Sequence, residues 1–163
     1  MLKLKKVNGK VKIIDIHGFE SAQLPSYNDC YKKYGNEFDF ILFLDFDEFV
    51  QIENNKDINT YLYNNRFEKC ETIVLNWVVY GDNDLVKYDN RTLVERFKKP
   101  YGNKKKGKCI VRTNISKLII TYSHKIGINI KYFCDSNGNR ICQRYLDKFN
   151  PPNKPEAFIN ILL

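Results

Sequence analysis

The sequence predicts an α/β domain built on a mixed sheet that is flanked by helices. Three observations lead to this class. Residues 10–16, 21–34 and 38–44 follow one another as strand, helix and strand, which is the order of a βαβ unit. Residues 40–44 form an uninterrupted apolar run, which is typical of a strand buried on both faces, as in a parallel sheet. Residues 72–80 give a second strong strand pattern.

The composition is that of one globular domain. With 163 residues, the chain is large enough to bury roughly 70% of its unfolded surface in a single core. Hydrophobic residues make up 43% and aromatic residues 14% of the chain, which excludes a disordered protein. Lys and Arg outnumber Asp and Glu by 27 to 19, giving a net charge of +8. This charge favours anionic partners such as nucleic acid, lipid head groups or nucleotide phosphates.

The cysteines and the N-terminal residues bear on location. None of the five cysteines lies in a Cys-x-x-Cys pair, so we expect reduced, partly buried thiols rather than a disulfide framework or a zinc ribbon. The sequence shows no long apolar leader and no run of transmembrane length. A cytoplasmic protein is expected, with peripheral contact to the inner face of an anionic membrane left open.

Local signals place the helices. Residues 10–16 follow an Asn-Gly turn and suit a hairpin or an edge strand. Residues 21–34 carry apolar and aromatic side chains at helical spacing, and Gly35 is expected to end that helix. Asp57 can cap a helix that runs to about Phe67. The inner face of this second helix is expected to carry Ile58, Tyr61 and Leu62.

The second half of the chain is expected to alternate between strands and turns. Residues 98–108 are rich in Lys and Gly and suit a solvated loop, with a phosphate contact as the alternative. Residues 109–112 and 118–122 have strand composition. Residues 135–139 have the composition of a turn. The chain then finishes on an apolar stretch, residues 157–163, for which the pattern gives no role.

Three carboxylates come directly after the first apolar run. They belong to Asp45, Asp47 and Glu48, and ligands of open α/β sheets bind outside the carboxyl ends of the strands. Clustered carboxylates repel one another unless a cation compensates them, and hard oxygen ligands favour Mg²⁺ or Mn²⁺. The sequence therefore predicts a cation site here. A strand-end cap or a solvated turn explains the same residues without a metal.

Two classes of enzyme place Asp-x-Asp after a strand. In phosphatases with an aspartyl nucleophile the pattern usually continues to Thr or Val. Here Glu48 and Phe49 follow, which counts against a covalent aspartyl-phosphate, and a metal-dependent phosphohydrolase is kept only as an alternative. In nucleotide-sugar glycosyltransferases the carboxylates hold a divalent ion on the donor diphosphate.

Five motifs in order resemble one such family. The sequence is similar to family-2-like and family-92-type inverting glycosyltransferases over about residues 11–138, with Tyr80 standing where the family has Phe. The first strand and the nucleotide-binding loop of the family have no counterpart here. We therefore expect residues 1–163 to be a single domain that is incomplete at its N-terminus. The matching motifs are residues 45–49, 77–81, 95–97 and 108–112, followed by His124.

The resemblance implies a GT-A-like, partly Rossmann-like fold and a metal-dependent, inverting transfer. The donor would be a nucleotide-diphosphate sugar, expected to be a UDP-sugar, and the acceptor a glycan or polysaccharide, as in the assembly of surface polysaccharide. Carried over by motif, Asp45, Asp47 and His124 would hold Mn²⁺ or Mg²⁺, although a structural role explains His124 equally well. Asp45 would also face the donor diphosphate, whose charge Lys108 and Arg112 would neutralise.

An inverting transfer also needs a general base for the acceptor hydroxyl. Glu95 is the candidate base, although an ion pair with Arg96 explains it equally well. Asp82 and Asp84 follow the strand of residues 72–80 and are the alternatives.

Two residues are expected to border the substrate. Trp77 can stack on a sugar ring or lie in the core. Glu48 is expected to brace the acidic segment from behind the metal ligands.

A different class of function is a basic binding module for nucleic acid or an anionic polymer. Its support is the net charge of +8 and the basic residues 98–108. The acidic cluster would repel phosphate, and the sequence contains no nucleic-acid motif, so nucleic acid is not the expected partner. The sequence does not specify the sugar, the acceptor, the linkage or the oligomeric state.

Overall fold

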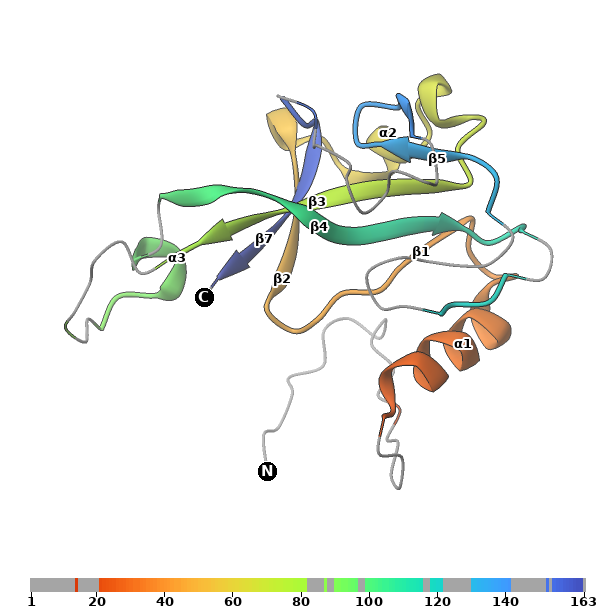
Figure 1. The fold of residues 1–163 in the computed structure, drawn as a ribbon, viewed down its shortest axis with the longest axis horizontal. Coiled ribbons are helices and arrows are strands. Elements are labelled where there is room, and N and C mark those ends of the chain that lie inside the picture. The colour runs from red at the N-terminus through yellow and green to blue at the C-terminus, as the bar shows by residue number, and fades with distance from the viewer. Residues whose placement is uncertain are drawn as a thin grey trace.

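The fold over the described residues is a seven-stranded mixed sheet with short helices on both sides (Figure 1). This architecture agrees with the predicted α/β class. Among the described residues, none of the helices combines the length and the hydropathy of a membrane-spanning segment. The computed structural model describes residues 14, 21–81, 87, 90–96, 99–115, 118–121, 130–141, 152 and 154–162.

Two long antiparallel strands, β3 (Thr72–Tyr80) and β4 (Pro100–Arg112), form the centre of the sheet. The short strand β1 (Phe40–Leu42) pairs antiparallel with the outer edge of β4. On the other edge of β3, β5 (Phe133–Asp135) runs parallel to its first residues, and β7 (Ala157–Leu162) runs parallel to its last ones. One strand therefore supports two different partners on the same edge.

Two further strands complete the sheet. The two-residue strand β6 (Arg140–Ile141) pairs with β5. The strand β2 (Glu48–Ile52) pairs antiparallel with β7 over its whole length and runs steeply across the direction of β4 in Figure 1. The segment that joins β1 to β2 therefore crosses from one edge of the sheet to the other.

Strand β3 is central because both of its faces are apolar. Ile73 and Leu75 pack in one core with Tyr61, whereas Val74 packs in a second core with Cys109. A strand covered on both faces needs no alternation of polar residues, and β-branched residues favour the pleated conformation. The strand predicted at residues 72–80 is confirmed.

Helices α1 (Gln23–Tyr34) and α2 (Ile58–Leu62) lie on opposite sides of the central strands. The predicted α1 is confirmed, and the Gly35 N–H donates to the Tyr31 carbonyl at its end. Asp57 caps α2 by accepting hydrogen bonds from two backbone N–H groups, as predicted. However, α2 is much shorter than expected.

The chain around α2 leaves the helical path early. Short 3₁₀ turns precede and follow the helix, at Glu53–Asn55 and Asn65–Phe67. Tyr61 and Leu62 are buried, as predicted for the inner face, but Ile58 is 40% exposed, so its predicted burial is wrong. This five-residue helix therefore places Tyr61 and Leu62 in the core but leaves Ile58 at the surface.

The predicted buried strand over residues 38–44 is wrong in two respects. Strand β1 holds only Phe40–Leu42, and these residues are half-buried at an edge of the sheet, antiparallel to β4. The chain leaves the sheet at Phe43 on its way to β2, and Leu44 is 38% exposed. An apolar run alone does not indicate whether a strand lies at the edge or in the centre of a sheet.

The solvated loop predicted for residues 98–108 is also wrong. These residues belong mainly to β4 and pair with β3. Gly107 has a direct role in this pairing, since a Cβ there would lie 1.9 Å from the Leu75 carbonyl oxygen. Only glycine permits such a close approach of two backbones, so a residue typical of loops here serves a strand.

The remaining predictions divide between the turn and the strands. The turn predicted at residues 135–139 is confirmed between β5 and β6. Residues 118–121 make only an isolated bridge at Ile119, so the strand predicted at 118–122 is wrong over its described part. The apolar C-terminal stretch is β7, and its Ala157 and Ile159 are fully buried. The strand predicted at residues 10–16 lies outside the described residues, apart from Ile14.

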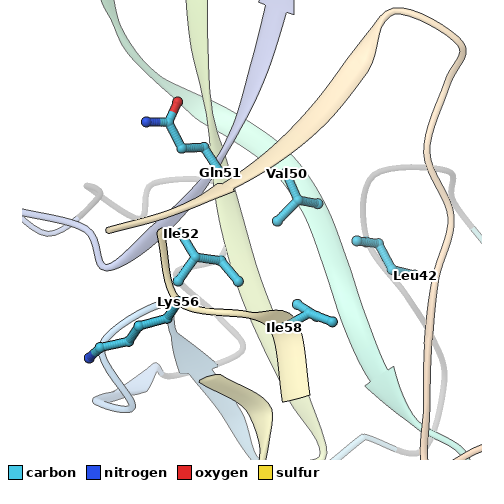
Figure 2. Close-up of a pocket in the computed structure, with 6 residues that line it drawn as sticks. All are labelled: Leu42, Val50, Gln51, Ile52, Lys56 and Ile58. Atoms are coloured by element: carbon cyan, nitrogen blue, oxygen red, sulfur yellow. The ribbon is translucent and has the colours of Figure 1, made fainter. Parts of the chain in front are cut away.

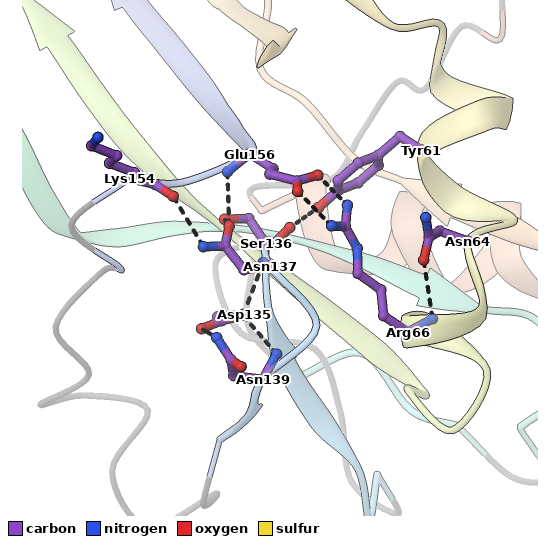
Figure 3. Close-up of polar contacts among 9 residues, drawn as sticks. All are labelled: Tyr61, Asn64, Arg66, Asp135, Ser136, Asn137, Asn139, Lys154 and Glu156. Carbon is purple, nitrogen blue, oxygen red and sulfur yellow. Dashed lines mark hydrogen bonds and ion pairs between the residues drawn. The ribbon is translucent and has the colours of Figure 1, made fainter. Parts of the chain in front are cut away.

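A polar cluster holds the β5–β6 turn against the start of β7 (Figure 3). The Arg66 guanidinium makes a bidentate ion pair with Glu156, with one contact of 2.6 Å. The Asn137 side-chain oxygen accepts from the Glu156 N–H at 2.8 Å, and the buried Tyr61 hydroxyl donates to the Ser136 carbonyl at 2.8 Å. Bidentate Arg–carboxylate pairs are geometrically specific, so this cluster fixes the position of β7.

A disulfide joins Cys70, just before β3, to Cys134 in β5. The expectation of reduced thiols is therefore wrong for this pair. The parallel pairing of β3 with β5 brings the two Cα atoms to 5.8 Å, although the cysteines are 64 residues apart in sequence. Among the described residues, Cys30 and Cys109 are not part of a disulfide.

We expect removal of this disulfide to destabilise the fold strongly. A cross-link that closes a loop of 64 residues contributes about 4 kcal/mol through the entropy of the unfolded chain. The C70S/C134S variant should therefore unfold at a much lower urea concentration than the oxidised protein, and the Cys30→Ser control should change little. Equal stability of the oxidised protein and the double variant would contradict the cross-link.

Candidate functional site

The candidate site is centred on a buried lysine. Lys108 lies in β4, and its side chain is 1% exposed. Its Nζ lies 2.8 Å from Asp45 Oδ2 and 3.5 Å from Glu48 Oε2. The Glu48 side chain is 2% exposed and that of Asp45 is 40% exposed. Burying one of these charges alone would be costly, so the three groups compensate one another.

The segment between β1 and β2, residues 43–47, is called here the acidic loop. It is closed by two hydrogen bonds, from the Asp45 N–H to Glu48 Oε2 at 2.8 Å and from the Glu48 N–H to the Asp45 carbonyl at 3.1 Å. Glu48 therefore makes the bracing contact that its predicted role requires. The tip carries Phe46, which is fully exposed, and Asp47, which is also exposed.

Helix α1 contacts the acidic loop on its other side. Gln23 Nε2 donates to Asp45 Oδ1 at 3.1 Å and to the Tyr27 hydroxyl at 3.2 Å. The Tyr27 ring stacks on Phe43, with ring centroids 4.1 Å apart and planes 15° apart. Both carboxylate oxygens of Asp45 thus have partners within the protein.

The electrostatics keep Lys108 charged. Burial lowers the pKa of its ammonium, but the hydrogen bond that it donates to Asp45 and the charge of Glu48 together raise it more, so the net pKa lies above its usual value. Because the folded pKa of Lys108 is raised, the ion pair stabilises the fold below the unfolded pKa of about 10.4 while its carboxylate partners are ionised. On the basic side, that contribution is lost as the pH rises through the folded pKa. Burial also raises the pKa of the Tyr27 hydroxyl, which therefore stays protonated.

The donor set around the acidic loop fits a divalent cation in part. Three carboxylates and one ammonium leave a local charge of about −2, and carboxylate oxygens suit Mg²⁺ or Mn²⁺. Asp47 makes no hydrogen bond or ion pair with another described residue. No group of three His, Cys, Asp or Glu side chains in the described part of the chain forms a metal site alone. An ion here would need oxygens from a diphosphate or water, as Mg²⁺ commonly does.

The other residues predicted to contact the diphosphate have partners inside the protein. Arg112 donates from Nε to the Cys70 carbonyl at 2.8 Å and from a terminal nitrogen to the Phe67 carbonyl at 3.0 Å, and it lies over the Phe40 ring. It therefore secures the turn before β3. The ammonium of Lys108 is enclosed by the acidic loop, so it faces carboxylates rather than solvent.

Glu95 caps the short helix α3 (Leu93–Arg96). Its Oε2 accepts hydrogen bonds from the Thr92 N–H and the Thr92 hydroxyl, both at 2.9 Å. The bond from the Thr92 N–H is the one that the Glu side chain makes in a capping box, for which Thr-x-x-Glu is the sequence signal. Sequence reasoning overlooked that signal. In Figure 1, α3 lies at the end of β3 and β4 that is far from β1.

The remaining predicted residues are divided between the sheet and the undescribed part of the chain. Trp77 is half-buried in β3 and packs against the core that contains Leu75. The predictions for Asp82, Asp84 and His124 lie outside the described residues.

A cleft of about 450 Å³ opens beside the acidic loop (Figure 2). Leu42 and Val50, which line it, stand on the strands that enter and leave the loop. Leu42 is three residues before Asp45, so the Cα atoms of these two residues are at most about 10 Å apart along the chain. No motif or pattern in the sequence predicted this cleft. Its lining residues are Leu42, Val50, Gln51, Ile52, Lys56 and Ile58.

The chain was compared with models of known protein families. The sequence model of glycosyltransferase family 92 matches residues 6–149. This match includes the acidic loop, β3 and β4. No curated protein matches the chain.

We expect Lys108→Met to destabilise the fold by about 3–5 kcal/mol, because it leaves the buried carboxylate of Glu48 without a cation. Urea unfolding measures this loss. The double variant K108M/E48Q removes both charges and should recover most of it. The control Lys33→Ala breaks an exposed pair with Asp29 on α1 and should cause no measurable loss. Equal stability of Lys108→Met and the native protein would contradict the buried pair.

Proposed function

The chain belongs to glycosyltransferase family 92 and is a glycosyltransferase, and we propose that it transfers a sugar from a UDP-sugar to a glycan acceptor with inversion. The observation that carries this proposal is the acidic loop. Its tip presents Asp47 to solvent while Lys108 compensates the two carboxylates behind it. The loop thus keeps one uncommitted carboxylate at an exposed position. In this proposal, the mixed sheet is a GT-A-like fold.

Asp47 is the proposed direct ligand of Mn²⁺ or Mg²⁺, with Asp45 and His124 as its predicted companions. A bound divalent ion offsets the negative charge that develops on the departing diphosphate. The protein's own residues have the role of holding the acidic loop in place before the donor binds. Glu48 accepts a hydrogen bond from the Asp45 N–H. Lys108 holds the carboxylates of Asp45 and Glu48 in place.

The cleft beside the acidic loop is the proposed acceptor site. Its volume of about 450 Å³ lies within the range of small-molecule sites. Leu42, Val50 and Ile58 give it an apolar wall, and Gln51 and Lys56 add polar groups that can orient hydroxyls. The acceptor would then reach the donor across the exposed tip of the loop.

The general base is proposed to be Asp82 in preference to Glu95. The capping contacts with Thr92 give Glu95 a structural task that accounts for its position. In the sequence, Asp82 comes two residues after Tyr80, the last residue of β3, and ligands of α/β sheets gather at the carboxyl ends of strands. An aspartate there can accept the proton of the acceptor hydroxyl as its oxygen attacks the anomeric carbon.

The disulfide bears on where the reaction takes place. Disulfides form and persist in oxidising compartments, and Cys70 and Cys134 are both buried. We therefore propose an oxidising compartment instead of the cytoplasm expected from the sequence. The basic segment that suggested a nucleic-acid module is paired in β4, and no contact in the described part favours that function.

Substitution of Asp47 tests the metal site. We expect Asp47→Asn to weaken Mn²⁺-dependent binding of UDP by about 100-fold, or about 2.7 kcal/mol, with the unfolding midpoint unchanged because the side chain is exposed. Isothermal titration calorimetry with and without Mn²⁺ measures the affinity for UDP, and urea unfolding measures the midpoint. The control Glu68→Gln changes an exposed carboxylate in another part of the chain. Native affinity for UDP in Asp47→Asn, or native protein that binds no UDP with Mn²⁺, would refute the proposed site.

A pair of substitutions separates the two candidate bases. Gln can replace Glu in a capping box, so Glu95→Gln should keep the helix and most of kcat. Asp82→Asn should lower kcat by about 10²–10⁴-fold, the usual contribution of general base catalysis. Sugar transfer measured at saturating donor decides between them. A large fall of kcat in Glu95→Gln with normal thermal stability would reverse the assignment.

A further inference from the structure

Helix α1 is anchored at its C-terminal half. The Tyr31 hydroxyl donates to the Thr113 carbonyl at 2.6 Å. The Asn28 amide donates to the Ile120 carbonyl at 2.9 Å and accepts from the Ile120 N–H at 3.0 Å. These bonds tie the helix to segments far along the chain, so α1 is a fixed support rather than a loosely packed helix.

The N-terminal half of α1 meets the acidic loop at matching spacing. Gln23 and Tyr27 are one turn apart, which corresponds to a rise of about 6 Å. Phe43 and Asp45 are two residues apart in the acidic loop, and two residues of extended chain span about 6.6 Å. The helix therefore contacts the loop twice, through the Tyr27–Phe43 stack and the Gln23–Asp45 hydrogen bond. Two contacts fix both the position and the direction of the segment.

The two donors to Asp45 have different effects. Lys108 supplies a point charge, which attracts the carboxylate without setting its plane. The Gln23 amide binds the other oxygen at 3.1 Å and is itself held by the Tyr27 hydroxyl at 3.2 Å. The carboxylate is thus bound from β4 and from α1 at once. Its orientation, and with it the path of the chain to Asp47, is set from both sides.

We propose that Gln23 and Tyr27 are positioning residues for the donor site of this glycosyltransferase. They act through Asp45 and Phe43, and hold the acidic loop in the conformation that presents Asp47 to the metal–diphosphate. This inference rests on the proposed function of the loop. Binding to a loop that is already ordered is tighter, because the cost of ordering is not taken from the binding energy.

Gln23→Ala tests the proposal without threatening the fold. Gln23 is exposed at the first residue of α1, and Ala is the best helix former. We expect amide hydrogen exchange of residues 43–48, measured without ligand, to accelerate about 3–10-fold, as loss of one hydrogen bond implies. The Kd for UDP with Mn²⁺ should rise by a similar factor, and the melting temperature should stay unchanged. The control Lys32→Ala, on an exposed position of the same helix, should leave all three unchanged.

A second variant shows whether Gln23 acts through Asp45. Asp45→Ala leaves Lys108 its contact with Glu48. In that background Gln23→Ala should add nothing to the exchange rate of the loop, because the bond is already absent. An equal acceleration in both backgrounds would overturn the proposal, and so would unchanged exchange or unchanged Kd in Gln23→Ala alone.

The binding measurement and the exchange measurement test the proposed function and this inference separately. Native protein that binds no UDP with Mn²⁺ would refute the donor site, and with it the claim that α1 serves that site. The exchange measurement in the absence of ligand would still decide whether α1 holds the loop.

Discussion

The buried ammonium of Lys108 and its two carboxylates, Asp45 and Glu48, constrain the whole site. The effective cost of burying each ion is several kcal/mol, and only close pairing offsets it. The chain between β1 and β2 therefore has to pass over the middle of β4, where Nζ lies 2.8 Å from Asp45 and 3.5 Å from Glu48. This requirement holds Asp45 and Glu48 against β4, and the contacts of Gln23 and Tyr27 hold the acidic loop from the side of α1. It also leaves Asp47 as the exposed carboxylate.

The sheet makes this arrangement possible. Gly107 lets the backbones of β4 and β3 approach closely just before Lys108, and the pairing of β2 with β7 carries Glu48 across the sheet. The disulfide and the Arg66–Glu156 pair hold the partners of β3 on its far edge. The elements that carry the charges are thus fixed by contacts that lie away from the site.

How much of this was predictable depended on how local each signal was. Strand β3, helix α1 and the β5–β6 turn were predicted because apolar periodicity and turn residues lie within each segment. Residues 109–112 of β4 were predicted as a strand, but its earlier part was missed because its Lys and Gly residues suggested a solvated loop. The Cys70–Cys134 bond was missed because its partners meet only through the parallel pairing of two strands. In the site, the grouping of Asp45, Asp47 and Glu48 was predicted because these residues are close together in the sequence. The burial of Lys108 was not predicted, because it depends on the passage of the acidic loop over β4, which no local pattern indicates.

The central claim is that Lys108 retains Asp45 and Glu48 while Asp47 receives the metal. Crystals of the protein with Mn²⁺ and UDP, measured at the manganese absorption edge, test it most directly. We expect an anomalous peak about 2 Å from an Asp47 oxygen, with the Lys108–Asp45 contact kept at the 2.8 Å of the structure. A manganese ion that displaces Lys108 from Asp45, or one bound away from the acidic loop, would contradict the account.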